Sequence, residues 1–129
     1  MIGLAEGIAK KLQIKHGMRI CLVGAPPEYQ EIVKDFPKTV EIATALRGQF
    51  DLVHAFFKKL DDVLARAEKL KAAVKDGGIV WISYPKAEGL GTDVNRDILW
   101  EKLKPFGLEA VAQVSIDETW SALRFKVVA

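Results

Sequence analysis

The fold of this chain is decided by residues 50–84, which read FDLVHAFFKKLDDVLARAEKLKAAVKDGGIVWISY. The apolar runs at residues 50–57 and 79–84 are typical of strands that are buried on both faces. The segment between them carries apolar residues every three or four positions among lysines and acids. This spacing predicts one amphipathic helix, which Gly77-Gly78 should end in a left-handed cap. A strand, a helix and a strand in this order predict two parallel strands joined by a right-handed crossover.

The pattern continues toward the amino end. Residues 19–23 (RICLV) predict another buried strand, and the glycine and two prolines that follow it predict a loop or a helix start. Helical spacing predicts helices at residues 4–12 and at about residues 28–35. Residues 39–42 predict a short strand whose place in the sheet stays open. The link that follows, residues 43–49, is barely long enough to cross back under the first strand.

A further helix and a hairpin are expected toward the carboxyl end. Thr92 or Asp93 should cap the helix. Its inner face is expected to carry Val94, Ile98 and Leu103. Residues 111–116 and 123–128 predict two strands, and the short turn at residues 117–121 makes them an antiparallel pair.

These elements predict a single α/β domain over residues 1–129, with three layers and a Rossmann-like, mostly parallel sheet that ends in an antiparallel hairpin. A hydrophobic share of 50% and a charged share of 28% are ordinary for one globular domain. No apolar run approaches the roughly 20 residues that span a bilayer. Residues 1–12 lack a signal-peptide pattern, so we expect a cytoplasmic protein without membrane contact. The net charge of +2, spread over mixed lysines and acids, gives no nucleic-acid signal.

The metal-binding residue types are too few and too scattered for a site. Cys21, His16 and His54 show none of the paired spacings that zinc sites use, so no metal is expected. Cys21 lies inside an apolar run, which favours a buried and unreactive thiol.

Several features resemble the class I S-adenosylmethionine-dependent methyltransferases over residues 17–129. These are the glycine after the first strand, the strand opening FDLV at residues 50–53, the sequence Asp76-Gly77-Gly78 before a strand, and the closing hairpin. The resemblance implies S-adenosylmethionine as cofactor, with Gly24 near its methionine end and Glu41 on its ribose.

The chain departs from that family in two ways. It has one glycine followed by two prolines, and residues 43–49 leave no room for the usual helix–strand–helix unit. A reduced methyltransferase-like fold is therefore expected.

A second resemblance spans nearly the whole chain, to a family of small bacterial Rossmann-like domains of unknown function. It brings no activity with it. The residues that carry it are Leu22-Val23-Gly24-Ala25-Pro26 with Tyr29, Phe50 to His54, Ser83-Tyr84-Pro85-Lys86, Thr92-Asp93 with Arg96, and Asp117 to Ser121 through Arg124-Phe125.

A ligand is expected at the carboxyl ends of the parallel strands, where open α/β sheets bind their ligands. If the hairpin pairs beside the strand of residues 79–84, its turn meets the same edge, because an antiparallel strand begins where its neighbour ends. The candidate ligand-binding residues are Gly24, Ala25, His54, Lys86, Arg96, Asp117, Glu118 and Trp120.

Two interpretations of these residues stay open. In the functional one, Trp120 walls a pocket, Lys86 binds an anionic group, and Asp117 or Glu118 contacts a polar substrate. In the structural one, which we favour, Lys86 forms a rim salt bridge with Asp117 or Glu118, worth about 0–1 kcal/mol. Trp120 then covers the end of the sheet, stacked on the Lys86 ammonium.

A catalytic set is not evident. His54 lies among apolar residues, so a neutral, hydrogen-bonded core histidine is favoured over a general base. Ser83 and Ser121 lack a visible histidine–acid partnership, which argues against a serine nucleophile. Arg96 is expected to pair with an acid one turn away.

The leading functional prediction is a non-catalytic or weakly catalytic domain that binds a small anionic ligand or a protein partner at the edge with Gly24, Lys86 and Trp120. One alternative is a minimal S-adenosylmethionine-dependent methyltransferase. Another is a structural domain that forms a homo-oligomer, which an exposed Trp100 would favour.

Overall fold

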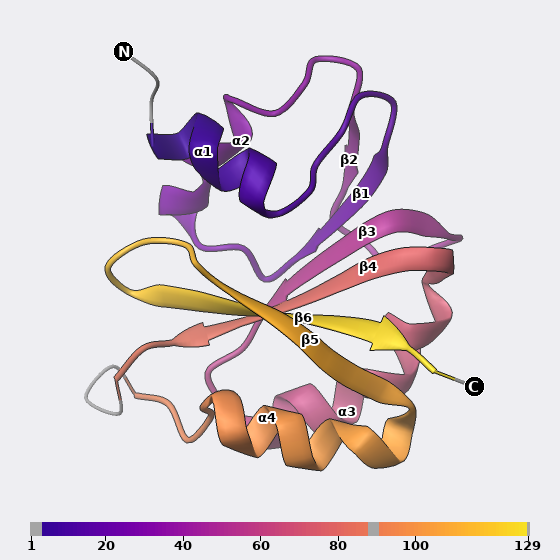
Figure 1. Cartoon of the computed structure of the whole chain (residues 1–129), viewed down its shortest axis with the longest axis vertical. Helices are drawn as coiled ribbons and strands as arrows, with labels where there is room; N and C mark the ends of the chain where they lie inside the picture. The colour runs from indigo at the N-terminus through magenta and orange to yellow at the C-terminus, as the bar shows by residue number, and fades with distance from the viewer. Residues whose placement is uncertain (1–3, 88–90, 129) are drawn as a thin grey trace.

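A twisted six-stranded sheet runs through the molecule in the computed structural model, which describes residues 4–87 and 91–128 (Figure 1). Its elements in chain order are α1 (Leu4–Lys11), β1 (Arg19–Val23), η1 (Pro27–Tyr29), α2 (Gln30–Val33), β2 (Glu41–Ala43), β3 (Phe50–Phe56), α3 (Leu60–Ala72), β4 (Val74–Pro85), α4 (Arg96–Leu103), η3 (Lys104–Phe106), β5 (Leu108–Ser115) and β6 (Trp120–Val127).

The order of the strands confirms a mostly parallel sheet with a terminal hairpin. The strands follow one another as β2-β1-β3-β4-β6-β5. The first four are parallel, while β6 runs antiparallel to β4 and β5 antiparallel to β6. The strand expected near residues 39–42 does join the sheet, because Glu41 pairs with Arg19 at its outer edge. The return link is short enough that Leu46 packs directly on the core beside α3.

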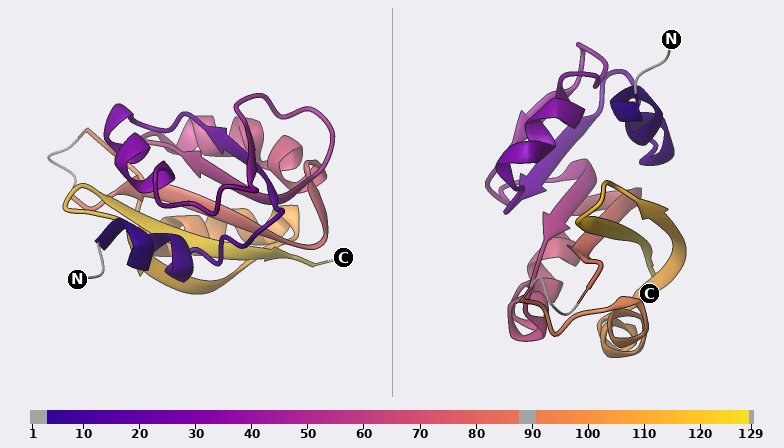
Figure 2. Two further views of the ribbon diagram at one scale, coloured as in Figure 1. Left: turned by 90° about the horizontal axis from the view of Figure 1, so that it is seen from above. Right: turned by 90° about the vertical axis from the view of Figure 1, so that its left-hand side faces the viewer.

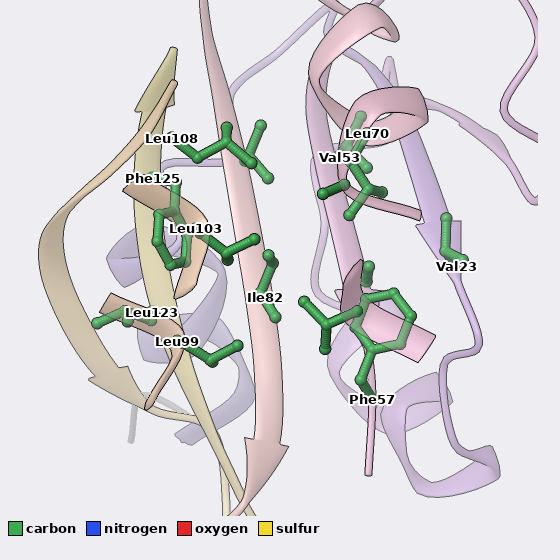
Figure 3. Packing of buried hydrophobic residues seen from close by; sticks show 14 of the residues in the cluster. Val23, Val53, Phe57, Leu70, Ile82, Leu99, Leu103, Leu108, Leu123 and Phe125 are labelled. Atoms are coloured by element: carbon green, nitrogen blue, oxygen red, sulfur yellow. The ribbon is translucent and has the colours of Figure 1, made fainter. Parts of the chain in front are cut away.

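The two faces of the sheet bury separate hydrophobic clusters, which gives the three expected layers. Helices α1 and α2 cover one face, and α3 and α4 cover the other (Figure 2). On the first face the Trp81 indole Nε1 donates to the Leu12 carbonyl at 3.0 Å, which ties the end of α1 to the sheet. On the second face Leu70, Leu99 and Leu103 pack on strand residues such as Ile82 (Figure 3).

The helix expected to run to Gly77-Gly78 is shorter, and the prediction that these glycines cap it is wrong. Helix α3 ends at Ala72, and β4 already begins at Val74. Both glycines lie inside β4, where the pairing with β3 shifts between Phe50 and Leu52. A Cβ on Gly78 would collide with the Val74 side chain and with nearby backbone carbonyls. The two glycines therefore allow an irregular part of β4 and do not end a helix.

The cap of α4 also differs from the prediction. Asn95 is the cap, because its Oδ1 accepts from the Ile98 amide at 2.9 Å. Thr92 and Asp93 instead hold the preceding loop against the start of α3. The Thr92 hydroxyl donates to the Lys58 carbonyl at 2.7 Å, and the Asp93 carboxylate accepts from the Leu60 amide at 2.7 Å.

Other boundaries move by a few residues. The helix expected at residues 28–35 is a 3-10 turn followed by the short α2. The hairpin strands are longer than expected. Apolar residues mark only part of the length of such strands, because their outward-facing positions are polar. The inner face of α4 carries Leu99 and Leu103, while Ile98 is only partly buried. In the described residues, no helix is long and apolar enough to cross a membrane.

The packing of α4 gives a stability prediction. Leu103 is fully buried, so Leu103→Ala should lower the free energy of unfolding by about 2–5 kcal/mol in urea denaturation. Val111→Ala is the control, because Val111 is 45% exposed and its truncation should change stability by less than about 0.5 kcal/mol. Equal losses in both variants would contradict this placement of the core.

Candidate functional site

The predicted edge, where the parallel strands end and the hairpin turn begins, is formed in the structure. Strands β1, β3 and β4 end on the same side of the sheet, and β6 begins there because Trp120 pairs with Pro85. The Lys86 amide donates to the Thr119 carbonyl at 2.8 Å, which fixes the hairpin turn against the end of β4. In Figure 1 this turn lies at the left, on the side to which the arrow of β4 points.

Two separate cavities divide the candidate residues. We call the first the edge pocket, a cavity of about 480 Å³ whose lining includes Gly24, Pro26, Glu28, Phe56, Lys58 and Trp120. We call the second the polar pocket, a cavity of about 650 Å³ whose lining includes Tyr84, Lys86, Arg96, Gln113, Ser115 and Ser121. Gly24 and Trp120 are thus brought together, as are Lys86 and Arg96, but the two pairs line different cavities. Asp117 and Glu118 line neither of them.

Trp120 is the main wall of the edge pocket. It is 6% exposed, and its ring meets the edge of Phe56 with centroids 5.3 Å apart. Its Nε1 is buried and has no hydrogen-bond partner among the described residues. An unpaired buried donor costs roughly 1–3 kcal/mol. A small shift that let a ligand or a water supply an acceptor would recover this energy.

Gly24 brings the loop after β1 close to the end of β3. Its φ of +68° lies in the left-handed region, and a Cβ there would stand 3.2 Å from the Phe56 carbonyl. Only glycine meets both conditions without strain. Ala25, next along the loop, is partly buried against the cluster that contains Trp120.

His54 lies directly beneath the edge pocket rather than in it. Its ring stacks on Phe56 with centroids 4.3 Å apart, and the side chain is fully buried. Nδ1 is 3.1 Å from the Tyr29 hydroxyl, and Nε2 is 2.6 Å from the Ser83 hydroxyl. Burial lowers the pKa of His54 from 6.5 to about 3, so the ring is neutral at physiological pH.

Ser83 hydrogen-bonds to His54, but among the described residues no acid completes the histidine–acid partnership that a serine nucleophile needs. Ser83 and His54 share one face of the sheet on the neighbouring strands β3 and β4. The third member of the chain is the Tyr29 phenol instead of a carboxylate, and burial raises its pKa. All three side chains are at most 1% exposed, so they hold the core together and do not meet a substrate. Period-two spacing along each strand could have shown the shared face, but not which strands are neighbours.

Asp117 closes the hairpin turn. One of its carboxylate oxygens, Oδ1, accepts from the amides of Thr119 and Trp120, both at 2.8 Å. The expected salt bridge from Lys86 to Asp117 or Glu118 is not present among the described residues. The Lys86 ammonium donates to the Ser115 hydroxyl at 2.6 Å instead. Glu118 is exposed, and Trp120 packs on Phe56 rather than on Lys86.

Two further candidates sit in unexpected places. Arg96 pairs with its neighbour Asp97 at 3.3 Å, not with an acid one turn away. In the register of the sheet, Glu41 of β2 lies opposite Arg19, which begins β1, whereas Gly24 follows the carboxyl end of β1. The structure therefore does not bring Gly24 and Glu41 to one cofactor pocket.

Cys21 is buried in the core cluster of the α3 face. Burial raises the pKa of its thiol, and Arg19 opposes this shift only in part. The thiol is therefore less ionised than a free cysteine and poorly suited to act as a nucleophile.

Comparison with known proteins supports the fold. No family model and no curated protein matches the chain. A methyltransferase from Aquifex aeolicus that depends on S-adenosylmethionine (SAM) has a similar structure, with a TM-score of 0.69 and 14% identity, covering 96% of this chain and 89% of that one. A TehB-like SAM-dependent methyltransferase from Corynebacterium glutamicum gives a TM-score of 0.60 at 14% identity, with 95% and 87% covered. The complex of DhpI with SAH (S-adenosylhomocysteine) gives 0.60 at 15% identity, with 97% and 85% covered.

These likenesses show that the chain has a methyltransferase-like Rossmann fold, as expected from the sequence. At such low identities they show the fold alone. The resemblance to small bacterial domains of unknown function stays a prediction.

The buried His54 gives a pH prediction. Because its pKa is lower in the folded state than in the unfolded one, the unfolded state binds more protons between pH 6.5 and about 3. Unfolding free energy should therefore fall as the pH drops through this window, by up to about 1.4 kcal/mol per pH unit from this residue.

Chemical denaturation of His54→Gln over the same pH range measures the effect. The variant should lose this part of the slope, whatever its stability at neutral pH. His16→Gln, a change at an exposed histidine, should keep the wild-type slope. Identical pH profiles for the wild type and His54→Gln would show that His54 is not a buried neutral residue.

Proposed function

We propose that this chain binds an S-adenosyl compound, SAM or its demethylated product SAH, in the edge pocket. The observation that carries the proposal is the position of this pocket. It lies at the carboxyl ends of parallel strands in a fold shared with SAM-dependent methyltransferases over nearly its whole length. SAM, when bound, supplies a methyl group on a positively charged sulfur.

The lining of the edge pocket suits such a ligand. The aromatic rings of Phe56 and Trp120 offer a surface for a nucleoside base or for a sulfonium cation. Glu28 and Lys58 contribute one charge of each sign, which matches a ligand with both an amino and a carboxylate group. The unpaired indole N–H of Trp120 is buried in this wall and would become a further donor after a small shift.

The volume and backbone of the pocket are also compatible. Its volume of about 480 Å³ lies within the range of small-molecule sites, about 300–1,000 Å³. The left-handed turn at Gly24 leaves no side chain between the loop and the end of β3. Gly24 is exposed and lines the pocket, so a ligand can contact its backbone there.

A second candidate function is the binding of a different small ligand in the same pocket, without catalysis. The position of Glu41 favours it, because no acidic side chain of β2 stands at the carboxyl end to hold a ribose. The buried Tyr29–His54–Ser83 chain favours it too, because these groups cannot reach a substrate. A structural role in a homo-oligomer remains a third proposal, which the 43% exposure of Trp100 supports.

Isothermal titration with SAH and SAM tests the proposal. We expect saturable binding of at least one of them, and Trp120→Phe should weaken it about tenfold by removing one hydrogen bond from a preserved aromatic wall. Trp100→Phe, an equal change on the outer face of α4, should leave the affinity unchanged.

The outcomes separate the candidates. No heat of binding with either compound at about 1 mM, a concentration that detects even weak complexes, would exclude the S-adenosyl proposal. A thermal shift with other small anions or nucleotides, lost in Trp120→Phe, would then support the second candidate. Binding that Trp120→Phe leaves unchanged would show that the ligand makes no hydrogen bond to the indole N–H and would contradict this contact.

A further inference from the structure

The polar pocket lies on the other side of the end of β4, on the face covered by α3 and α4. Three segments that are distant in sequence build it. Lys86 follows β4, Arg96 begins α4, and Ser115 and Ser121 come from the hairpin strands. None of the residues assigned to the edge pocket above lines it. It is therefore a separate site, and the S-adenosyl proposal does not use it.

Internal hydrogen bonds hold the floor of this pocket in place. The Gln113 amide donates to the Tyr84 hydroxyl at 3.0 Å and to the Ser121 hydroxyl at 3.1 Å. Tyr84 and Ser121 are buried, at 4% and 5% exposure. Because a buried side chain with fixed partners has little freedom, the hydroxyl groups keep their positions whether or not a ligand is present.

Hydrogen bonds also position the exposed rim. The Lys86 ammonium donates to Ser115 at 2.6 Å, and its backbone is bound to the hairpin turn. Asn95 caps α4 through the Ile98 amide, which fixes the residue before Arg96. The amino end of α4 adds a partial positive charge on this side of the pocket.

The side chains of the polar pocket can still offer a ligand more hydrogen-bond donors than acceptors. Ser115 accepts from Lys86, so its own proton is available, and Tyr84 accepts from Gln113 in the same way. Lys86 has further ammonium protons, and in the described part of the chain Arg96 uses only its Nε, toward Asp97. Acceptors are fewer, mainly the Asp97 carboxylate and the Gln113 carbonyl.

We propose that the polar pocket binds a small hydroxylated molecule that carries one carboxylate or phosphate-monoester group. Lys86 and Arg96 hold the anionic group. The lining contains these two cations and one carboxylate, Asp97, so its net charge is positive. The Tyr84 and Ser115 hydroxyls donate to the same group or to the body of the ligand. Asp97 and Gln113 accept from the ligand's hydroxyl groups.

NMR titration of the ¹⁵N-labelled full chain tests the proposal, with glycerol 3-phosphate and glycerate as probes at constant ionic strength. We expect saturable shifts of the amides around Lys86, Arg96 and Ser115 with at least one probe. The better probe identifies which anionic group the site prefers. Lys86→Gln and Arg96→Gln should each weaken binding about tenfold or more, and Tyr84→Phe should weaken it several-fold.

Lys38→Gln is the matched control, because it removes the same charge from an exposed position before β2 and should leave the affinity unchanged. Each of these residues except Tyr84 is exposed, so the charge variants should fold normally, as their NMR spectra will show. Equal weakening in Lys38→Gln would mean attraction to net charge alone and would overturn the proposal. So would shifts confined to other surfaces, or none at about 10 mM probe.

The S-adenosyl proposal is tested independently. Trp120→Phe should leave binding of these probes intact, and Lys86→Gln should leave binding of SAH intact. Either proposal can therefore fail while the other holds.

Discussion

The antiparallel pairing of β6 with β4 is the constraint on which the rest of the structure depends. It sets Trp120 opposite Pro85 and brings the hairpin turn to the edge where the parallel strands end. Without it, the end of β4 would have no neighbour on that side, and neither pocket would close. Trp120 lines one cavity and Ser121, the next residue along the strand, lines the other, because successive side chains point to opposite faces of a sheet.

Much of the architecture could be predicted from the sequence, because its strands are buried on both faces and its helices have one apolar stripe. The boundaries of β1 follow from the RICLV run alone. The start of β4 could not be predicted, because Lys75 and Asp76 with two glycines resemble a helix end. The segment is a strand because it pairs with β3, and Gly78 is the residue that fits its crowded position. Local sequence is a weak guide where tertiary packing decides.

The candidate site was predicted only in part, for a similar reason. The edge itself follows from strand polarity, so Gly24, Lys86 and Trp120 could be placed near it. Which of them face one another depends on the face of the sheet and on the loop after β4, which no periodicity specifies. The partners of Lys86 and Asp117 are a serine and two backbone amides. Sequence reasoning favours charged partners and so missed both.

The short link after β2 makes the two outer sides of the sheet unequal. Only residues 44–49 connect β2 to β3, and their Leu46 is partly buried against the core cluster of the α3 face. The outer edge of the sheet is therefore short and simple, while the opposite edge carries the long hairpin. The edge pocket and the polar pocket both lie at the carboxyl ends of the parallel strands, where the start of α4, the hairpin turn and the loop after β1 meet.

The buried chain from Tyr29 through His54 to Ser83 has a consequence for how this protein can change over evolutionary time. A neutral imidazole carries one proton, so one neighbouring hydroxyl must donate to it while the other accepts from it. If any one of these three residues is replaced by an apolar residue, a polar atom of its neighbour is left without a hydrogen-bond partner in the buried interior. Drift at these positions is therefore expected to be concerted, with an apolar trio as a viable end point and mixed intermediates disfavoured.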